Sequence, residues 1–151
     1  MTNTVLFSAK NKEENATGKN EHAKRVAAAI ADATNLSSYP IGKHTSIPIT
    51  NVLFIGCEVH GDGKPTRDFL RVLNELNPKD VKTVAIFSVA KSGTVSALAA
   101  AKPILEAKGI PVCDEEFFCK GASGFSNRGC PTEKDLQDAK EFGAMIAAKY
   151  R

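Results

Sequence analysis

Thr83-Val84-Ala85-Ile86-Phe87 is a continuous apolar run, and Val52-Leu53-Phe54-Ile55 is a second such run earlier in the chain. Neither run alternates apolar with polar residues, as a strand with one solvated face would. Strands that are covered on both faces have short continuous runs of this kind, which are typical of parallel sheets. We therefore expect both runs to be central strands of a parallel sheet, with Val84 and Ile86 buried.

Three further stretches complete the predicted sheet. Val5-Leu6-Phe7 is the first strand, and Ile110-Pro111-Val112-Cys113, leading to Phe117-Phe118, is the last. The stretch from Ser38 to Ile41 contains a proline and predicts a short edge strand, because proline is tolerated at a sheet edge.

Helical patterns lie between these strands. Two apolar stripes have the spacing i, i+3, i+4, i+7 of a helix with one buried face: Ala23, Val26, Ala27 and Ile30, and Phe69, Val72, Leu73 and Leu76. A third helix begins near Val95, and Pro103 is expected to kink or restart it because proline lacks an amide hydrogen. Thr132 is expected to cap the last helix, with Asp135 completing an imperfect capping box.

The repeated order of strand and helix predicts right-handed crossovers and one open parallel sheet. A chain of 151 residues has the usual size of one domain, so we expect a single domain over residues 1–151. The expected architecture is a three-layer α/β fold with helices on both faces of the sheet. In such folds ligands bind in a crevice outside the carboxyl ends of the strands.

Composition excludes several classes of function. The formal charge of +3 is small and evenly spread, which argues against nucleic acid as a partner. No apolar run approaches the roughly 20 residues of a membrane span, and the first run is too short for the core of a signal peptide. The cysteines Cys57, Cys113, Cys119 and Cys130 form no C-x-x-C pair. We therefore expect free thiols, no metal site and a cytoplasmic location.

Four loops follow the predicted strands and are rich in glycine and small hydroxyl residues, whose backbone amides can approach an anion or a flat ring closely. They are Ser8 to Lys19, Cys57 to Pro65, Ser88 to Thr94, and Cys119 to Pro131. The first loop ends in Thr17-Gly18 and opens into a helix, whose N-terminus favours a phosphate, although such a pair is also an ordinary helix cap. No nucleophile motif such as G-x-S-x-G is present, so no catalytic side chain is predicted.

Three stretches resemble the flavodoxin family, in its short-chain form. Thr17-Gly18 resembles the second half of the family's S/T-x-T-G-x-T phosphate loop. Phe54-Ile55-Gly56, followed by a polar loop and Phe69-Leu70, resembles the third strand, the flavin loop and the next helix. Phe118 to Gly121, and then Gly129 to Leu136 with its G-x-P-x-x-x-D-L pattern, resemble the C-terminal signature that leads into the final helix.

The resemblance implies the strand order 2-1-3-4-5 and non-covalent binding of flavin mononucleotide (FMN). The first loop would hold the phosphate and the later loops would enclose the flavin ring. By position, the phosphate residues are Thr17, Gly18, Lys19 and Asn20. The ring residues are Cys57, Glu58, Val59, His60, Gly61, Ser88, Val89, Ala90, Ser92 and Gly93.

The function implied by the resemblance is that of an FMN-binding redox protein, which transfers electrons to a redox partner protein as a monomer or a homodimer. A flavodoxin-like binding module without flavin is an alternative. It is favoured by the long stretch from Ser8 to Ala16 before the Thr-Gly pair, and by the absence of tryptophan and tyrosine from the flavin loops. An FMN-dependent reductase of quinone-type acceptors is a second alternative, and fold analogy alone does not separate these functions.

Overall fold

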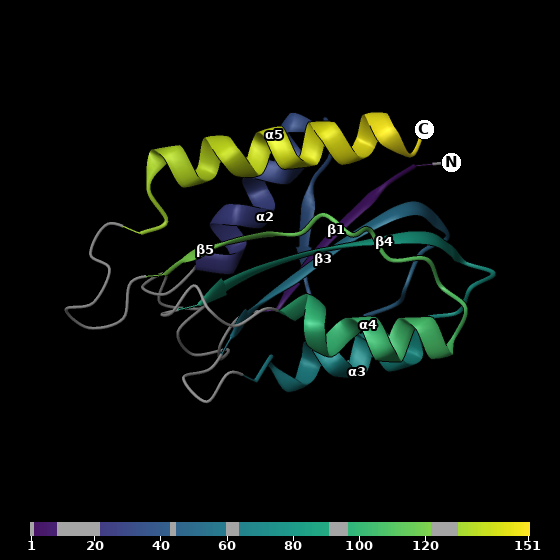
Figure 1. Cartoon of the computed structure of the whole chain (residues 1–151). Coiled ribbons are helices and arrows are strands. Elements are labelled where there is room, and N and C mark those ends of the chain that lie inside the picture. Colours follow the sequence, from purple (N-terminus) through teal and green to yellow (C-terminus); the bar gives the residue numbers. More distant parts are fainter. Residues whose placement is uncertain (1, 9–21, 43–44, 60–63, 91–96, 122–129) are drawn as a thin grey trace.

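The computed structural model describes residues 2–8, 22–42, 45–59, 64–90, 97–121 and 130–151. Five parallel strands form one sheet in the order β2-β1-β3-β4-β5, between two layers of helices (Figure 1). The strands are β1 (Thr4–Ser8), β2 (Ser38–Pro40), β3 (Thr50–Val59), β4 (Val81–Ala90) and β5 (Phe117–Lys120). The helices are α2 (His22–Ala33), α3 (Arg67–Glu75), α4 (Ala97–Ala107) and α5 (Glu133–Lys149). The three-layer α/β fold and the strand order expected from the sequence are confirmed.

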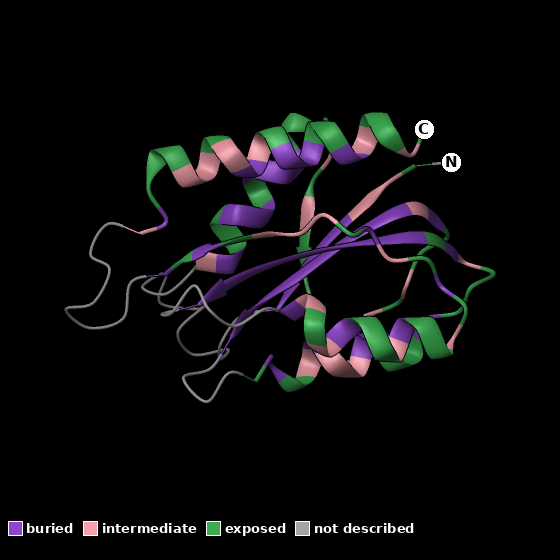
Figure 2. Ribbon diagram, viewed as in Figure 1, coloured by how far each residue is buried: buried purple, intermediate pink, exposed green. Residues whose placement is uncertain are grey.

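Each face of the sheet has its own apolar core, because successive side chains of a strand point to opposite faces. Phe54 and Phe87 belong to the core that α2 and α5 cover. Ile55 and Ile86 belong to the core that α3 and α4 cover. Figure 2 shows the resulting arrangement, in which buried strands lie between helices whose outer faces are exposed. Val84 and Ile86 are fully buried in the central strand β4, as predicted.

Both central strands extend further than their apolar runs. The strand β3 continues to Val59 and β4 continues to Ala90, so the segments predicted to be loops from Cys57 and from Ser88 begin as strand. Cys57 pairs with Ser88, and the next two positions pair in the same register. Burial and pairing with a neighbouring strand override the weak strand preference of a residue such as Glu58.

The last predicted strand is interrupted. Val112 forms a single bridge to Val84, and continuous pairing starts only where Phe117 lies opposite Phe87. Val112 and Phe117 are five positions apart and their partners are three apart, so the edge segment contains two extra residues. The charged stretch from Asp114 to Glu116 accommodates them, as extra residues in edge strands commonly are accommodated by a local bulge.

The helix α4 continues through Pro103, so the predicted restart does not occur. The proline removes the hydrogen bond to the carbonyl of Ala99. Both residues are exposed, and water can therefore bind the carbonyl that the proline leaves without a donor. None of the helices in the described ranges is long and apolar enough to cross a membrane.

The capping box predicted at the start of α5 is complete. The hydroxyl of Thr132 accepts a hydrogen bond from the backbone amide of Asp135 at 3.1 Å. The carboxylate of Asp135 accepts one from the amide of Thr132 at 2.8 Å. Aspartate therefore serves here where glutamate is usual, and the box fixes where the last helix begins.

Gly56 allows a close approach between β3 and the side chain of Phe87. The two residues pair in register, and Phe87 is fully buried. A Cβ atom at position 56 would overlap three carbons of the Phe87 ring. Since the ring occupies the space that a side chain at position 56 would need, only glycine fits there without a shift of the core.

We predict that Gly56→Ala lowers the free energy of unfolding by about 1–3 kcal/mol, the usual cost of overfilling a packed core. Urea denaturation of the ligand-free protein measures this loss. Gly42→Ala is the matched control, because a Cβ there would meet only the Thr45 hydroxyl, at 3.8 Å. Equal stability of the two variants would show that the Phe87 ring moves without cost.

Candidate functional site

The carboxyl ends of three neighbouring strands meet at one edge of the sheet. Ser8 at the end of β1 pairs with Cys57 of β3, and Cys57 pairs with Ser88 of β4. Ser88 in turn pairs with Phe118 of β5. We call these four residues the edge row. The segments proposed to hold phosphate and ring follow β1, β3 and β4 directly in the chain, so this edge corresponds to the ligand-binding end of an open α/β sheet.

The structure describes six of the residues predicted for the site, and all six are paired in the last three positions of β3 and β4. None is more than 8% exposed: Cys57, Glu58, Val59, Ser88, Val89 and Ala90. The other eight lie outside the described residues: Thr17, Gly18, Lys19, Asn20, His60, Gly61, Ser92 and Gly93. Cys57, Val59 and Ala90 point into the α3/α4 core and Val89 into the other. These four side chains therefore shape the edge by packing.

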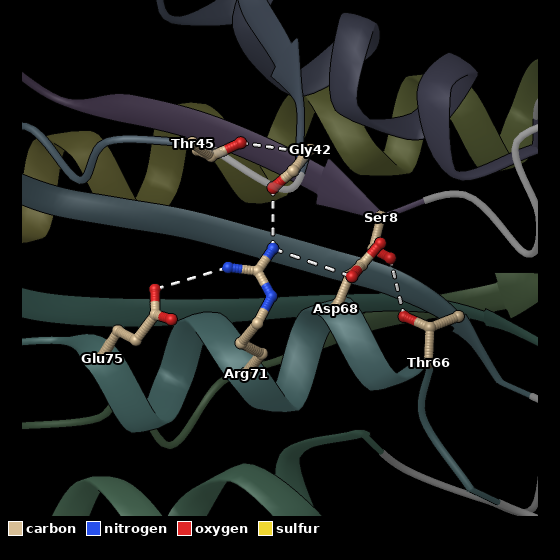
Figure 3. Close-up of polar contacts among 7 residues, drawn as sticks. All are labelled: Ser8, Gly42, Thr45, Thr66, Asp68, Arg71 and Glu75. Atoms are coloured by element: carbon tan, nitrogen blue, oxygen red, sulfur yellow. Dashed lines mark hydrogen bonds and ion pairs between the residues drawn. The ribbon is translucent and has the colours of Figure 1, made fainter.

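Two buried hydroxyl groups connect the end of β1 to the start of α3. The side-chain oxygens of Ser8 and Thr66 are 2.7 Å apart, at hydrogen-bond distance (Figure 3). Thr66 is the N-cap residue of α3, yet its side chain makes no capping hydrogen bond within the helix. Its hydroxyl is instead used to fix the N-terminus of α3 beside the carboxyl edge.

Cys57 is an unreactive thiol. The pKa of Cys57 is raised to about 12, mainly by burial; hydrogen bonds from Thr66 oppose this increase, and the charge of Glu58 adds to it. A thiol must lose its proton to act as a nucleophile, and Cys57 is in addition fully buried, so it serves packing rather than chemistry. All four cysteines are free in this structure. Across the described ranges, no three histidine, cysteine or acidic side chains gather where they could hold a metal ion.

Ser88 differs from the other hydroxyl residues of this edge. It is fully buried, and its hydroxyl oxygen has no hydrogen-bond partner within the part of the chain that the structure describes. Leaving a buried hydroxyl unpaired costs about 1–3 kcal/mol, so such groups are uncommon and often belong to functional sites. Ser88 was selected from its sequence position alone, and the unpaired hydroxyl is a property that only the structure reveals.

A second polar network holds the other side of α3. Arg71 donates a hydrogen bond to the carbonyl of Gly42 at 2.7 Å, and its guanidinium lies 3.7 Å from Asp68 and 3.4 Å from Glu75 (Figure 3). The amide of Gly42 donates to the hydroxyl of Thr45 at 2.6 Å. The sequence interpretation missed this network. Its only signal was the i, i+3 and i, i+4 spacing of the charges around Arg71.

Aromatic residues are distributed unevenly around the site. Tyr39 lies in the edge strand β2 and is 57% exposed, whereas Tyr150 is the C-cap of α5 and its carbonyl accepts a hydrogen bond from Asn51 near the start of β3. Neither tyrosine belongs to the carboxyl edge. Phe118 belongs to the edge row and is 45% exposed. It is therefore an aromatic side chain at this edge that the sequence interpretation did not select.

Known structures share this architecture. A short-chain flavodoxin associated with a non-canonical PDU bacterial microcompartment superposes with a TM-score of 0.71 at 13% identity, over 100% of both chains. Flavodoxin 1 from Bacillus cereus gives 0.63 at 18% identity, over 97% of this chain and 98% of that one. Rubredoxin oxygen:oxidoreductase from Desulfovibrio gigas gives 0.69 at 13% identity, over 99% of this chain but 36% of that larger one. No protein-family model matches the chain, and no curated protein sequence matches it either.

The chain therefore has the flavodoxin-like fold, and the sequence resemblance is confirmed at the level of the fold.

Two alanine variants test the roles of the edge hydroxyls. Ser8→Ala leaves the buried hydroxyl of Thr66 without its serine partner, so we expect the free energy of unfolding to fall by about 1–3 kcal/mol. Ser88→Ala removes a hydroxyl that has no partner, so we expect no loss or a small gain. Thermal and urea denaturation of ligand-free protein measure both. A loss for Ser88→Ala as large as that for Ser8→Ala would contradict the assignment of Ser88.

Proposed function

We propose that this chain is an FMN-binding redox protein that transfers electrons to a protein partner. The observation that carries the proposal is the edge row, in which β1 ends beside the last three residues of β3 and β4. Ser88 in this row has a buried hydroxyl without a hydrogen-bond partner among the described residues. The flavodoxin-like fold supports it, because the superposition on two proteins called flavodoxins covers nearly all of both chains. Bound FMN would supply the electron chemistry, and the protein would supply binding and electrostatics.

The residues present fit such a ligand. Thr17 has a hydroxyl that can donate to a phosphate, and the sequence that leads into α2 also contains Gly18, Lys19 and Asn20, whose amides and side chains are suitable donors for an anion. The hydroxyl of Ser88 can donate to or accept from a polar edge of the flavin ring. The thiol of Cys57 stays protonated and supports the row by packing. No side chain of the chain needs to act as an acid or a base.

The composition of the chain also bears on where the protein acts and with which partners. We propose that the protein acts in the cytoplasm with a redox partner protein, and without nucleic acid or a membrane. The unpaired cysteines are consistent with a reducing compartment. Because this chain has a formal charge of +3, we expect a redox partner whose binding does not depend on an acidic surface on this chain. A monomer and a homodimer are both compatible with this role.

One alternative has an observation in its favour. A binding module without flavin would explain why the described carboxyl edge carries no tyrosine, with Tyr39 and Tyr150 placed elsewhere, and why the chain has no tryptophan. An FMN-dependent quinone-type reductase would turn over a nicotinamide donor with a quinone, and that assay separates it from an electron carrier.

Titration of the apo-protein with FMN, followed by flavin fluorescence, tests the proposal. We expect saturable binding, and we expect Thr17→Ala to weaken it by about 0.5–1.5 kcal/mol, the net value of one hydrogen bond. Thr2→Ala, at the opposite end of the sheet, is the matched control and should bind as the wild type does. Absence of binding at about 100 μM protein, where a site worth only ~5.5 kcal/mol would half-fill, would favour the module without flavin.

A further inference from the structure

Two of the four cysteines line the same pocket. Cys119 lies in β5 and Cys130 lies two residues before the N-cap Thr132 of α5. Both line a pocket of about 380 Å³ whose remaining walls are Phe118, Lys120, Thr132 and Asp135. The end of the last strand and the segment that leads into the last helix therefore meet at this pocket, and each contributes one cysteine to its lining.

The surroundings of Cys119 disfavour its thiolate. The pKa of Cys119 is raised to about 12, mainly by burial and to a smaller extent by the charges of Asp135 and Cys130, while Arg25 acts in the opposite direction. The two thiols are also unequal, because Cys119 is 7% exposed whereas Cys130 is half-buried. Cys130 is therefore the thiol that a reagent in solution reaches first.

The other two cysteines, Cys57 and Cys113, are too far from Cys119 or on the wrong face of the sheet to form a disulfide with it. Cys113 donates its amide to Val84, and Cys119 pairs with Val89. Five positions along β4 separate these contacts, which is roughly 16 Å and well beyond the ~7 Å limit between the Cα atoms of a disulfide. Cys57 points into the core on the opposite face of the sheet.

We propose that Cys119 and Cys130 form a reversible disulfide that links the end of β5 to the start of α5. The oxidant would be a low-molecular-weight disulfide such as oxidised glutathione. The thiolate of Cys130 attacks one sulfur of the oxidant and releases one glutathione thiolate. Cys119, which lines the same pocket, then loses its proton to solvent and attacks the Cys130 sulfur of the mixed disulfide. The attack is intramolecular and needs only a small thiolate fraction, and it releases the second glutathione. The two cysteine thiols lose two electrons and two protons, and the oxidant gains both as two thiols.

The proposed disulfide would lie next to the edge row at the carboxyl ends of the strands. Phe118, the neighbour of Cys119, belongs to the edge row, so the disulfide would tie the start of α5 to the strand that ends this row. The chemistry needs no flavin, and the proposal therefore stands or fails independently of the proposed function.

Oxidation followed by peptide mapping tests the proposal. The folded protein is incubated with oxidised glutathione, free thiols are alkylated, and the chain is cleaved after lysine, arginine and glutamate. Glu115 and Glu116 lie between Cys113 and Cys119, so cleavage there separates these two thiols. We expect a cross-linked pair of peptides containing Cys119 and Cys130, lost again on treatment with dithiothreitol.

Single variants complete the test. Cys130→Ser should abolish the cross-link and leave Cys119 without glutathione, whereas Cys57→Ser should leave the cross-link unchanged. Cys119→Ser should accumulate glutathione on Cys130. If this buried variant does not fold, the wild-type map and Cys130→Ser still decide the outcome. A wild-type protein that only accumulates a mixed disulfide on Cys130, does not react, or cross-links through Cys113 would overturn the proposal.

Discussion

The ring of Phe87 fills the space that a side chain at position 56 would need, and the layers of the fold depend on this fit. The glycine lets the ring lie against β3, where it joins the aromatic side chains of the same core. Phe142 of α5 contacts Phe54 and Phe117 there, with ring centroids 6.3 and 6.1 Å apart. Phe87, Phe54 and Phe142 thus belong to one core, and glycine at position 56 leaves the space that Phe87 needs within it.

The same register positions the candidate site. Gly56 pairs with Phe7 and Phe87, and the next position along these strands is the edge row, where the side chains turn to the opposite face. A slip of one residue would send Ser8 and Ser88 into the α2/α5 core and the phenylalanines into the other. Aromatic packing in one layer therefore determines that polar groups gather in the other, beside the start of α3.

Much of the fold follows from local sequence signals. Continuous apolar runs revealed the central strands, and Thr132 with Asp135 revealed the start of the last helix, because both signals act over a few residues. The end of β3 did not follow, since Glu58 is a poor strand residue until its neighbours bury it. The pairing of Ser8 with Thr66 joins residues 58 positions apart, and no local pattern encodes such a contact. For the same reason Phe118 was not recognised as a member of the edge.

The central claim is that a ligand binds where β1, β3 and β4 end together. Amide chemical shifts of nitrogen-15-labelled protein during titration with FMN test it most directly. The account predicts that the amides of the edge residues Ser8, Cys57 and Ser88 shift with one common saturation curve. The amides at the opposite strand ends, Thr4, Thr50 and Val81, should stay in place. Shifts that concentrate at these opposite ends, with the edge amides unmoved, would contradict the account.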